Sequence, residues 1–111
     1  MAHPFSTNKG RKFRNRLVAK MFADQLGCCR MCGFEVSLSL RGKSDASSAV
    51  LDHIKPWRLA PSLGLVESNL QLICKRCHDT HCASIESKHW PDAEKIASEK
   101  LSCYGEDGWR I

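Results

Sequence analysis

Two Cys-x-x-Cys pairs constrain this chain of 111 residues more than any other feature of its sequence. The pairs are Cys29 with Cys32, and Cys74 with Cys77. A Cys-x-x-Cys turn aims both of its sulfurs at one point, and two such turns complete a tetrahedron around an ion such as zinc. A site closed by four thiolates has no open position for a substrate, so it stabilises a fold rather than catalyses. The spacing therefore predicts a structural zinc site.

Three further cysteines complete the set of seven: Cys28, Cys82 and Cys103. Cys28 directly precedes Cys29, but only Cys29 has two residues between itself and Cys32. The alternative interpretation of the two pairs is a set of buried free thiols. No apolar secretory signal follows the basic N-terminus, and in a reducing compartment such pairs are more often metal sites than disulfides. We therefore expect a cytoplasmic protein that contains zinc.

The positive charge of the chain is concentrated near its N-terminus. The net charge is +5, from 17 Lys and Arg against 12 Asp and Glu, and residues 1–20 contain Lys and Arg but no acid. A basic segment of this kind suits a polyanion such as DNA, although a solvated helix face has the same composition. There is no run of about 18 apolar residues, so we expect no membrane span.

The apolar pattern predicts one α+β domain. We divide it into a basic N-terminal helix (1–27), a zinc-stapled core (28–88) and a C-terminal helix with a tail (89–111). Residues 1–8 are expected to be a loose start in which Ser6, Thr7 or Asn8 caps the first helix. The predicted elements are a helix over 11–26, strands over 34–40, 50–54 and 69–74, and helices over 77–88 and 92–101, the last with Ala93, Ile96, Ala97 and Leu101 toward the core.

We call the two Cys-x-x-Cys turns knuckles. Two segments, one between the knuckles and one that contains the second, resemble the HNH endonucleases. They are Leu51–Pro56 (LDHIKP) and Asn69–His78 (NLQLICKRCH), and the resemblance covers about residues 28–82. Members of this family with a four-cysteine zinc have their knuckles in the same places. The resemblance implies a ββα-metal fold with flanking helices. The tail at 107–109 also looks like the ends of small phage-type HNH proteins. A domain this small has little surface for reading bases, so we expect weak specificity or a partner such as a phage packaging or other nucleic-acid-processing protein. Mobile-element movement and host defence are alternative settings.

The chemistry of phosphodiester cleavage fits the residue types at these positions. His53 has a side chain whose ordinary pKa lies near neutrality, so it suits a general base. The resemblance implies that Asp52 and His78 hold a catalytic divalent metal (Mg²⁺, Mn²⁺, Ni²⁺ or Zn²⁺), and that Asn69 orients the loop of the base or joins the metal shell. Neighbouring residues of an ideal strand point to opposite faces, so we expect a twist or bulge to bring Asp52 to the metal.

The sequence departs from many family members one helical turn beyond His78. His81 and Cys82 stand there, and His81 is a further candidate ligand, the alternative being a solvated histidine. Trp57 is expected in the core. The predicted DNA contacts are basic residues of the N-terminal segment and of the two motifs: Lys9, Arg11, Lys12, Arg14, Arg16, Lys55, Arg58, Lys75 and Arg76.

The sequence thus predicts a metal-dependent HNH endonuclease that hydrolyses DNA and leaves 5′-phosphate and 3′-hydroxyl ends. Two other functions use the same knuckles. A non-catalytic zinc-ribbon module would bind nucleic acid without needing the Asp52-His53 pair. A zinc domain for protein interaction would show no salt-dependent affinity for DNA.

Overall fold

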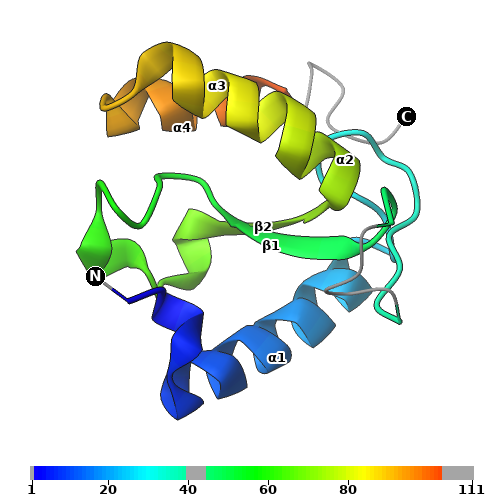
Figure 1. Cartoon of the computed structure of the whole chain (residues 1–111). Coiled ribbons are helices and arrows are strands. Elements are labelled where there is room, and N and C mark those ends of the chain that lie inside the picture. The colour runs from blue at the N-terminus through cyan, green and yellow to red at the C-terminus, as the bar shows by residue number, and fades with distance from the viewer. Residues whose placement is uncertain (1, 40–44, 104–111) are drawn as a thin grey trace.

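The centre of the fold is a two-stranded antiparallel sheet, formed by β1 (Ala49–His53) and β2 (Leu70–Cys74). The structure is a computed structural model that describes residues 2–39 and 45–103. Helices cover both faces of the sheet, with α1 on one side and the α2–α3 segment on the other (Figure 1). The register runs without a bulge from Ala49 opposite Cys74 to His53 opposite Leu70. Of the two alternatives expected at Asp52, the bulge is therefore wrong, and the twist stays a prediction.

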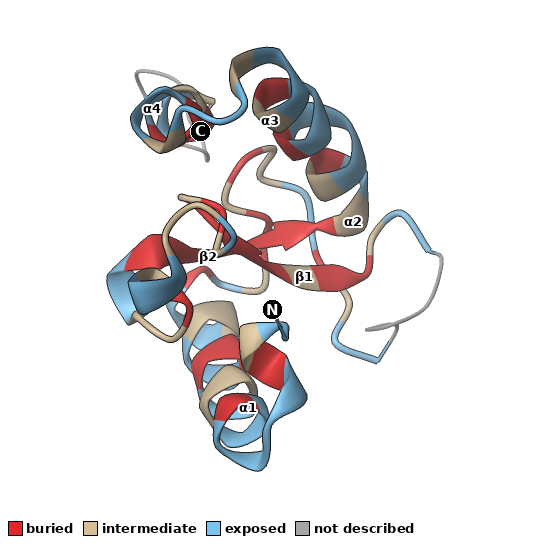
Figure 2. Cartoon of the chain, turned by 60° about the vertical axis from the view of Figure 1, so that its left-hand side comes forward, coloured by how far each residue is buried: buried red, intermediate tan, exposed pale blue. Residues whose placement is uncertain are grey.

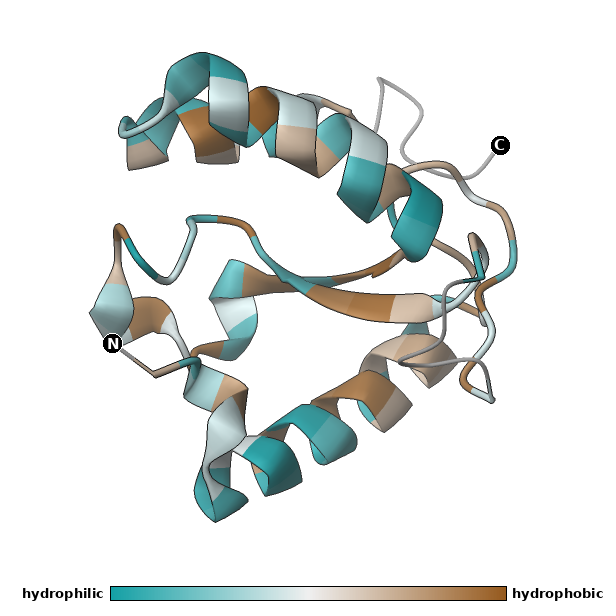
Figure 3. Cartoon of the chain, in the orientation of Figure 1, coloured by the Kyte–Doolittle hydropathy of each residue, from teal (hydrophilic) through white to brown (hydrophobic). Residues whose placement is uncertain are grey.

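Helix α1 (Asn8–Asp24) packs on one face of the sheet through Leu17 and Val18. It begins three residues before the predicted start, because the Thr7 side chain accepts a hydrogen bond from the backbone N–H of Gly10 and caps the helix. It ends where Leu26 and Gly27 adopt positive φ angles of 56° and 74°. The outer face of the helix is hydrophilic (Figure 3).

The N-terminal residues are ordered by a short 3₁₀ helix, η1 (Pro4–Ser6), where the sequence suggested a loose start. Its Phe5 is buried. The first turn of α1 approaches η1 so closely that a Cβ on Gly10 would lie 2.0 Å from the carbonyl oxygen of Pro4. Gly10 therefore allows the N-terminal segment to fold back along the sheet.

The opposite face is covered by a helical run from residue 75 to residue 89. It consists of α2 (Lys75–Cys77), a π-helical turn η4 (His78–Cys82) and α3 (Ala83–His89), where the sequence predicted one regular helix over 77–88. Helix α4 (Ala93–Ser102) follows, capped by the Asp92 carboxylate. Burial is confined to the faces of these helices that point inward (Figure 2).

The inward face of α4 differs from the prediction at two adjacent positions. Ile96 and Ala97 are buried as expected, but Lys100 is fully buried and Leu101 is 46% exposed. The prediction used only the spacing of apolar residues, so it placed Leu101 in the interior. It could not include Lys100, whose ammonium is buried because it contacts the carboxylates of Asp52 and Glu86.

The strand predicted over 34–40 is absent from its described part, residues 34–39. Only isolated bridges form, between Cys28 and Glu35 and between Ser37 and Ser48. The segment lies between two neighbours: Val36 donates to Gly27, and Ser37 accepts from Ala49. Each neighbouring segment forms only one bridged residue pair with it, so no ladder forms.

Two further 3₁₀ turns, η2 (Pro61–Leu63) and η3 (Glu67–Asn69), organise the loop between the strands. No helix in the described residues is both long and apolar enough to cross a membrane. The tail at 107–109, with its resemblance to phage-type proteins, lies outside the described residues.

Candidate metal centre and active site

The two knuckles meet at the end of the sheet. The thiol sulfurs of four cysteines all lie within 4.8 Å of one another: Cys29, Cys32, Cys74 and Cys77. Among the described residues, this is the only such group of three or more potential metal ligands. Zn–S bonds of about 2.3 Å in a tetrahedron place sulfurs about 3.8 Å apart. The Cys32 and Cys74 sulfurs are 3.8 Å apart. The cluster therefore fits a tetrahedral metal ion.

Backbone groups and burial also suit a cation at this cluster. The N–H groups of Met31 and Cys32 point at the Cys29 sulfur at 3.3 and 3.5 Å, and the N–H of Cys77 points at the Cys74 sulfur at 3.5 Å. Burial raises the pKa of Cys77 to about 12. A bound cation would therefore favour the thiolate form of Cys77, which burial disfavours.

Cys28, Cys82 and Cys103 lie outside the cluster, as predicted. Cys28 is buried beside Cys29, and its thiol faces the carbonyl of Leu26 at 3.5 Å. The cluster thus uses the cysteine that has the two-residue spacer.

A pocket of about 360 Å³ is lined by the end of β1 and by α3, among other segments. It brings together Asp52 and His53 from β1 with His78 from the π-helical turn, although 25 residues separate His53 from His78 in the sequence. The remaining lining residues are His3, Leu51, Pro56, Trp57, Arg58, Glu86 and Trp90. Three of the four predicted catalytic or metal-holding residues therefore share one pocket.

The imidazole of His53 is fixed in one orientation. Its Nε2 lies 2.9 Å from the carbonyl oxygen of Gly64, and a carbonyl can only accept, so Nε2 carries the proton. Its ring stacks on Phe5 with centroids 5.2 Å apart. Within the described residues Nδ1 has no hydrogen-bond partner. Burial lowers the pKa of His53 below 6.5, although the bond to Gly64 and the charge of Asp52 act to raise it.

The Asp52 carboxylate is buried and held from the side of β2. Its Oδ2 accepts a hydrogen bond of 2.9 Å from Nε2 of Gln71, the residue opposite it in the sheet. Its Oδ1 lies 3.9 Å from Nε2 of His78. A carboxylate oxygen and an imidazole nitrogen that face each other in a pocket form a suitable donor pair for a divalent metal.

Asn69 lies beneath the loop that follows His53 and does not line the pocket. Its Oδ1 accepts from the backbone N–H of Lys55 at 2.9 Å, and its Nδ2 donates to the carbonyls of Lys55 and Leu63 at 3.0 and 3.3 Å. The backbone carbonyl of Asn69 accepts from Ile54 at 2.8 Å. The geometry fits the loop-orienting alternative and not the metal-shell alternative.

His81 and Cys82 do not line the pocket. His81 is exposed, whereas Cys82 is buried with its sulfur 4.0 Å from that of Met31. The π-helical turn shifts the register after His78, so positions that would share a face in a regular helix diverge here. The expectation that His81 touches the metal thus finds no geometric support.

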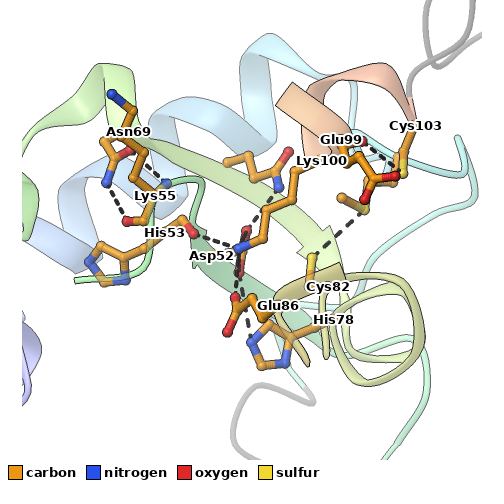
Figure 4. A network of polar contacts seen from close by, with 12 residues as sticks. Asp52, His53, Lys55, Asn69, His78, Cys82, Glu86, Glu99, Lys100 and Cys103 are labelled. Atoms are coloured by element: carbon orange, nitrogen blue, oxygen red, sulfur yellow. Dashed lines mark hydrogen bonds and ion pairs between the residues drawn. The ribbon is translucent and has the colours of Figure 1, made fainter. Parts of the chain in front are cut away.

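Sequence reasoning missed several residues around the pocket. Trp57 was expected in the core but is half-buried in the pocket wall, and Trp90 is 46% exposed there. His3 reaches the pocket from the N-terminus, with its ring 5.8 Å from that of His53. Glu86 lines the pocket and bonds to Lys100 (Figure 4). The hydrophobic pattern of a sequence does not predict contacts between residues that are far apart in the chain.

The nine predicted DNA contacts have different surroundings. Arg58 lines the pocket, with its guanidinium over the Trp57 ring, and Arg14 lies near enough to His3 to help lower its pKa, after burial and His53. Lys55 pairs with Glu94 at 2.7 Å, and Lys75 pairs with Asp79. Arg76 faces the Cys32 sulfur at 3.8 Å and the Phe34 ring. The remaining four predicted contacts are exposed on α1: Lys9, Arg11, Lys12 and Arg16.

Comparison with known proteins identifies the family to which the central part of the chain belongs. No curated protein and no solved structure matches the chain. Residues 29–83 match the family model described as HNH endonuclease. This range begins at the first cysteine of the metal cluster, includes both strands together with His53 and His78, and ends one residue after the π-helical turn. The two-stranded sheet, the flanking helices and the four-cysteine site agree with a ββα-metal domain, and the chain therefore carries a domain of the HNH endonuclease family, for which nucleic acid is the substrate.

Proposed function

We propose that this chain is a metal-dependent endonuclease that hydrolyses phosphodiester bonds of DNA, with His53 as its general base. One observation carries the proposal: the only nitrogen of His53 left free by the Gly64 hydrogen bond belongs to a ring that lines the same pocket as Asp52 and His78. A base, a carboxylate and a second imidazole around one concavity are the groups that hydrolysis of a phosphodiester requires.

The proton-accepting role falls to Nδ1 of His53. A water molecule in the pocket would give its proton to this nitrogen as its oxygen attacks the phosphorus. The lowered pKa of His53, caused by its burial, keeps the ring neutral and ready to accept at neutral pH. Phe5 and Gly64 hold the ring in place, so little orientational freedom is lost when the substrate binds.

Asp52 and His78 are the residues that would hold the catalytic metal. The donor set is one carboxylate oxygen and one imidazole nitrogen, 3.9 Å apart, which suits a divalent cation. When held by these two residues, such a cation would supply the positive charge that stabilises the phosphate and the departing 3′ oxygen. The products would be a 5′-phosphate and a 3′-hydroxyl end.

Substrate binding is assigned to positive side chains around the pocket. Arg58 lies in the pocket wall and Arg14 lies near His3 at its edge, so both can meet phosphates on either side of the bond that is cleaved. We assign the four-cysteine cluster to structural zinc, which fixes β2 and the helical run that carries His78.

The test is a plasmid-cleavage assay with the purified zinc-loaded chain in Mg²⁺, Mn²⁺, Ni²⁺ or added Zn²⁺. Nicked or linear plasmid should appear in at least one of these metals and disappear in Asp52→Ala and His78→Ala variants. Ends that a ligase reseals directly would identify 5′-phosphate products. A chain that retards DNA in a gel but leaves it intact in every metal would instead be a non-catalytic zinc-ribbon module.

A further inference from the structure

Lys100 has the least solvent exposure of any charged side chain described in this protein. Its side chain is 0% exposed, and it comes from α4, outside the residues that match the HNH family model. A buried ammonium is costly, and an apolar residue of similar volume is often as stabilising or more so at such a position. Its presence beside the pocket therefore calls for more than a packing explanation.

The ammonium of Lys100 joins three elements at one point (Figure 4). It donates to the backbone carbonyl of His53 at 2.7 Å and to Oε2 of Glu86 on α3 at 2.7 Å. It also lies 3.3 and 3.2 Å from Oδ1 and Oδ2 of Asp52. Burial acts to lower the pKa of Lys100, but Asp52 and Glu86 outweigh it and raise the pKa, so the group stays charged.

We infer that Lys100 is a positioning residue of the candidate active site, which acts through the backbone of His53 and the carboxylate of Asp52. The inference rests on the proposed function. The His53 carbonyl lies at the end of β1, where the ladder with β2 stops at Leu70. The bond from Lys100 fixes this last peptide unit, and with it the direction from which the His53 ring reaches Gly64.

The same ammonium sets the rotation of Asp52. Gln71 holds Oδ2 from one side and Lys100 holds both oxygens from another, which leaves Oδ1 directed at His78. Hydrogen bonds of this kind to a ligand residue commonly change metal affinity or activity by about 10- to 100-fold when they are lost. Helix α4 thus contributes to the catalytic centre from outside the family core.

The first test compares Lys100→Met with Lys95→Met, an exposed lysine of the same helix. At a temperature where both variants are folded, single-turnover cleavage by Lys100→Met should be about 10- to 100-fold slower than wild type. Its affinity for DNA without divalent metal should stay within about twofold, because Lys100 cannot reach the solvent. Lys95→Met should match wild type in both measurements.

A double variant separates positioning from charge balance. Lys100→Met leaves the carboxylates of both Asp52 and Glu86 without their shared cation, and this alone can disturb the fold. Lys100→Met combined with Glu86→Gln gives these three groups the same net charge as in wild type, so the double variant should fold and still cleave slowly. Recovery of the wild-type rate, or failure of this double variant to fold, would show that Lys100 serves only the fold and would overturn the inference.

A spectroscopic readout keeps the test independent of activity. In ¹⁵N-histidine NMR spectra of the zinc-loaded chain, wild-type His53 should be a single Nε2–H tautomer, and the Lys100→Met and double variants should show a mixture with Nδ1–H. Unchanged His53 signals in both variants would contradict the inference. If wild type cleaves no DNA, the proposed function fails, whereas these spectra still decide the role of Lys100.

Discussion

The side chain of Asn69 hydrogen-bonds both backbone groups of Lys55, the second residue after His53. It also reaches the carbonyl of Leu63, next to the residue that holds the His53 ring. One buried amide therefore ties together the two ends of the β1–β2 loop that fix the candidate base, without lining the pocket itself.

Asn69→Ala should lower both stability and cleavage. It removes bonds to the N–H and carbonyl of Lys55 and to the carbonyl of Leu63, and we expect a loss of about 2–3 kcal/mol in the free energy of unfolding. Urea unfolding measures the first effect, and the cleavage rate at a temperature where the variant is folded measures the second. Asn15→Ala, an exposed position on α1, is the control. A fully active, stable Asn69→Ala protein would exclude the loop-orienting role.

The choice of Cys29 rather than Cys28 as a metal ligand can be tested by a matched pair of serine substitutions. Cys29→Ser should reduce the zinc that remains after dialysis and lower the melting temperature strongly, because a structural zinc site contributes directly to folding. Cys28→Ser should keep one tightly bound zinc per chain, since its thiol is outside the cluster. Equal zinc retention by the two variants would contradict the assigned ligand set.

The N-terminal segment should respond to pH through His3. Nδ1 of His3 accepts a hydrogen bond from the N–H of Phe5 at 3.0 Å, and protonation of this nitrogen breaks the bond. Burial, with help from His53 and Arg14, lowers the pKa of His3 below its ordinary value of 6.5. Below pH 6.5 the unfolded chain therefore binds the proton more readily than the folded chain, and the contribution of His3 to stability falls as the pH falls.

The check is His3→Asn, which keeps an acceptor for Phe5 but does not titrate. Between pH 8 and pH 5, the free energy of unfolding of wild type should fall more steeply than that of His3→Asn, and the Phe5 amide should exchange faster in wild type at pH 5. Parallel pH profiles for the two proteins would show that the His3 bond contributes nothing that depends on protonation.

Two arginines should affect DNA binding in different ways. Arg58 lines the pocket, so Arg58→Ala should weaken binding to all sequences and reduce the slope of log Kd against log salt by about 0.9, the value for one phosphate contact on duplex DNA. Arg76 faces the Cys32 sulfur and Phe34, so Arg76→Ala should leave that slope unchanged. Fluorescence anisotropy across a salt series measures both, and identical slopes for wild type and Arg58→Ala would remove Arg58 from the interface.

The sequence predicted the parts of this molecule that depend on local spacing. The Cys-x-x-Cys pairs, the two central strands and the first helix follow from short-range patterns, and the structure confirms them. The HNH resemblance also identified the family correctly. The roles of Asp52, His53, Asn69 and His78 remain proposals that the geometry supports.

What the sequence did not predict depends on distant contacts. Lys100 is buried on α4 because Asp52, Glu86 and the His53 carbonyl surround its ammonium. The periodicity of apolar residues does not predict these contacts. The alternating residues Phe34, Val36 and Leu38 resemble a strand, but the segment lacks a continuous partner. His3 enters the pocket only because η1 folds back against α1.

The most direct test of the account is the single-turnover cleavage rate of His53→Ala beside that of His81→Ala. Both substitutions remove an imidazole, but only His53 lines the pocket and presents a free Nδ1, whereas His81 is exposed outside it. With the best metal and saturating protein, His53→Ala should be slower than wild type by about 10²- to 10⁴-fold while it still binds DNA, and His81→Ala should cleave at the wild-type rate. A His53→Ala protein that is folded, binds DNA and cleaves as fast as wild type would contradict the assignment of the general base.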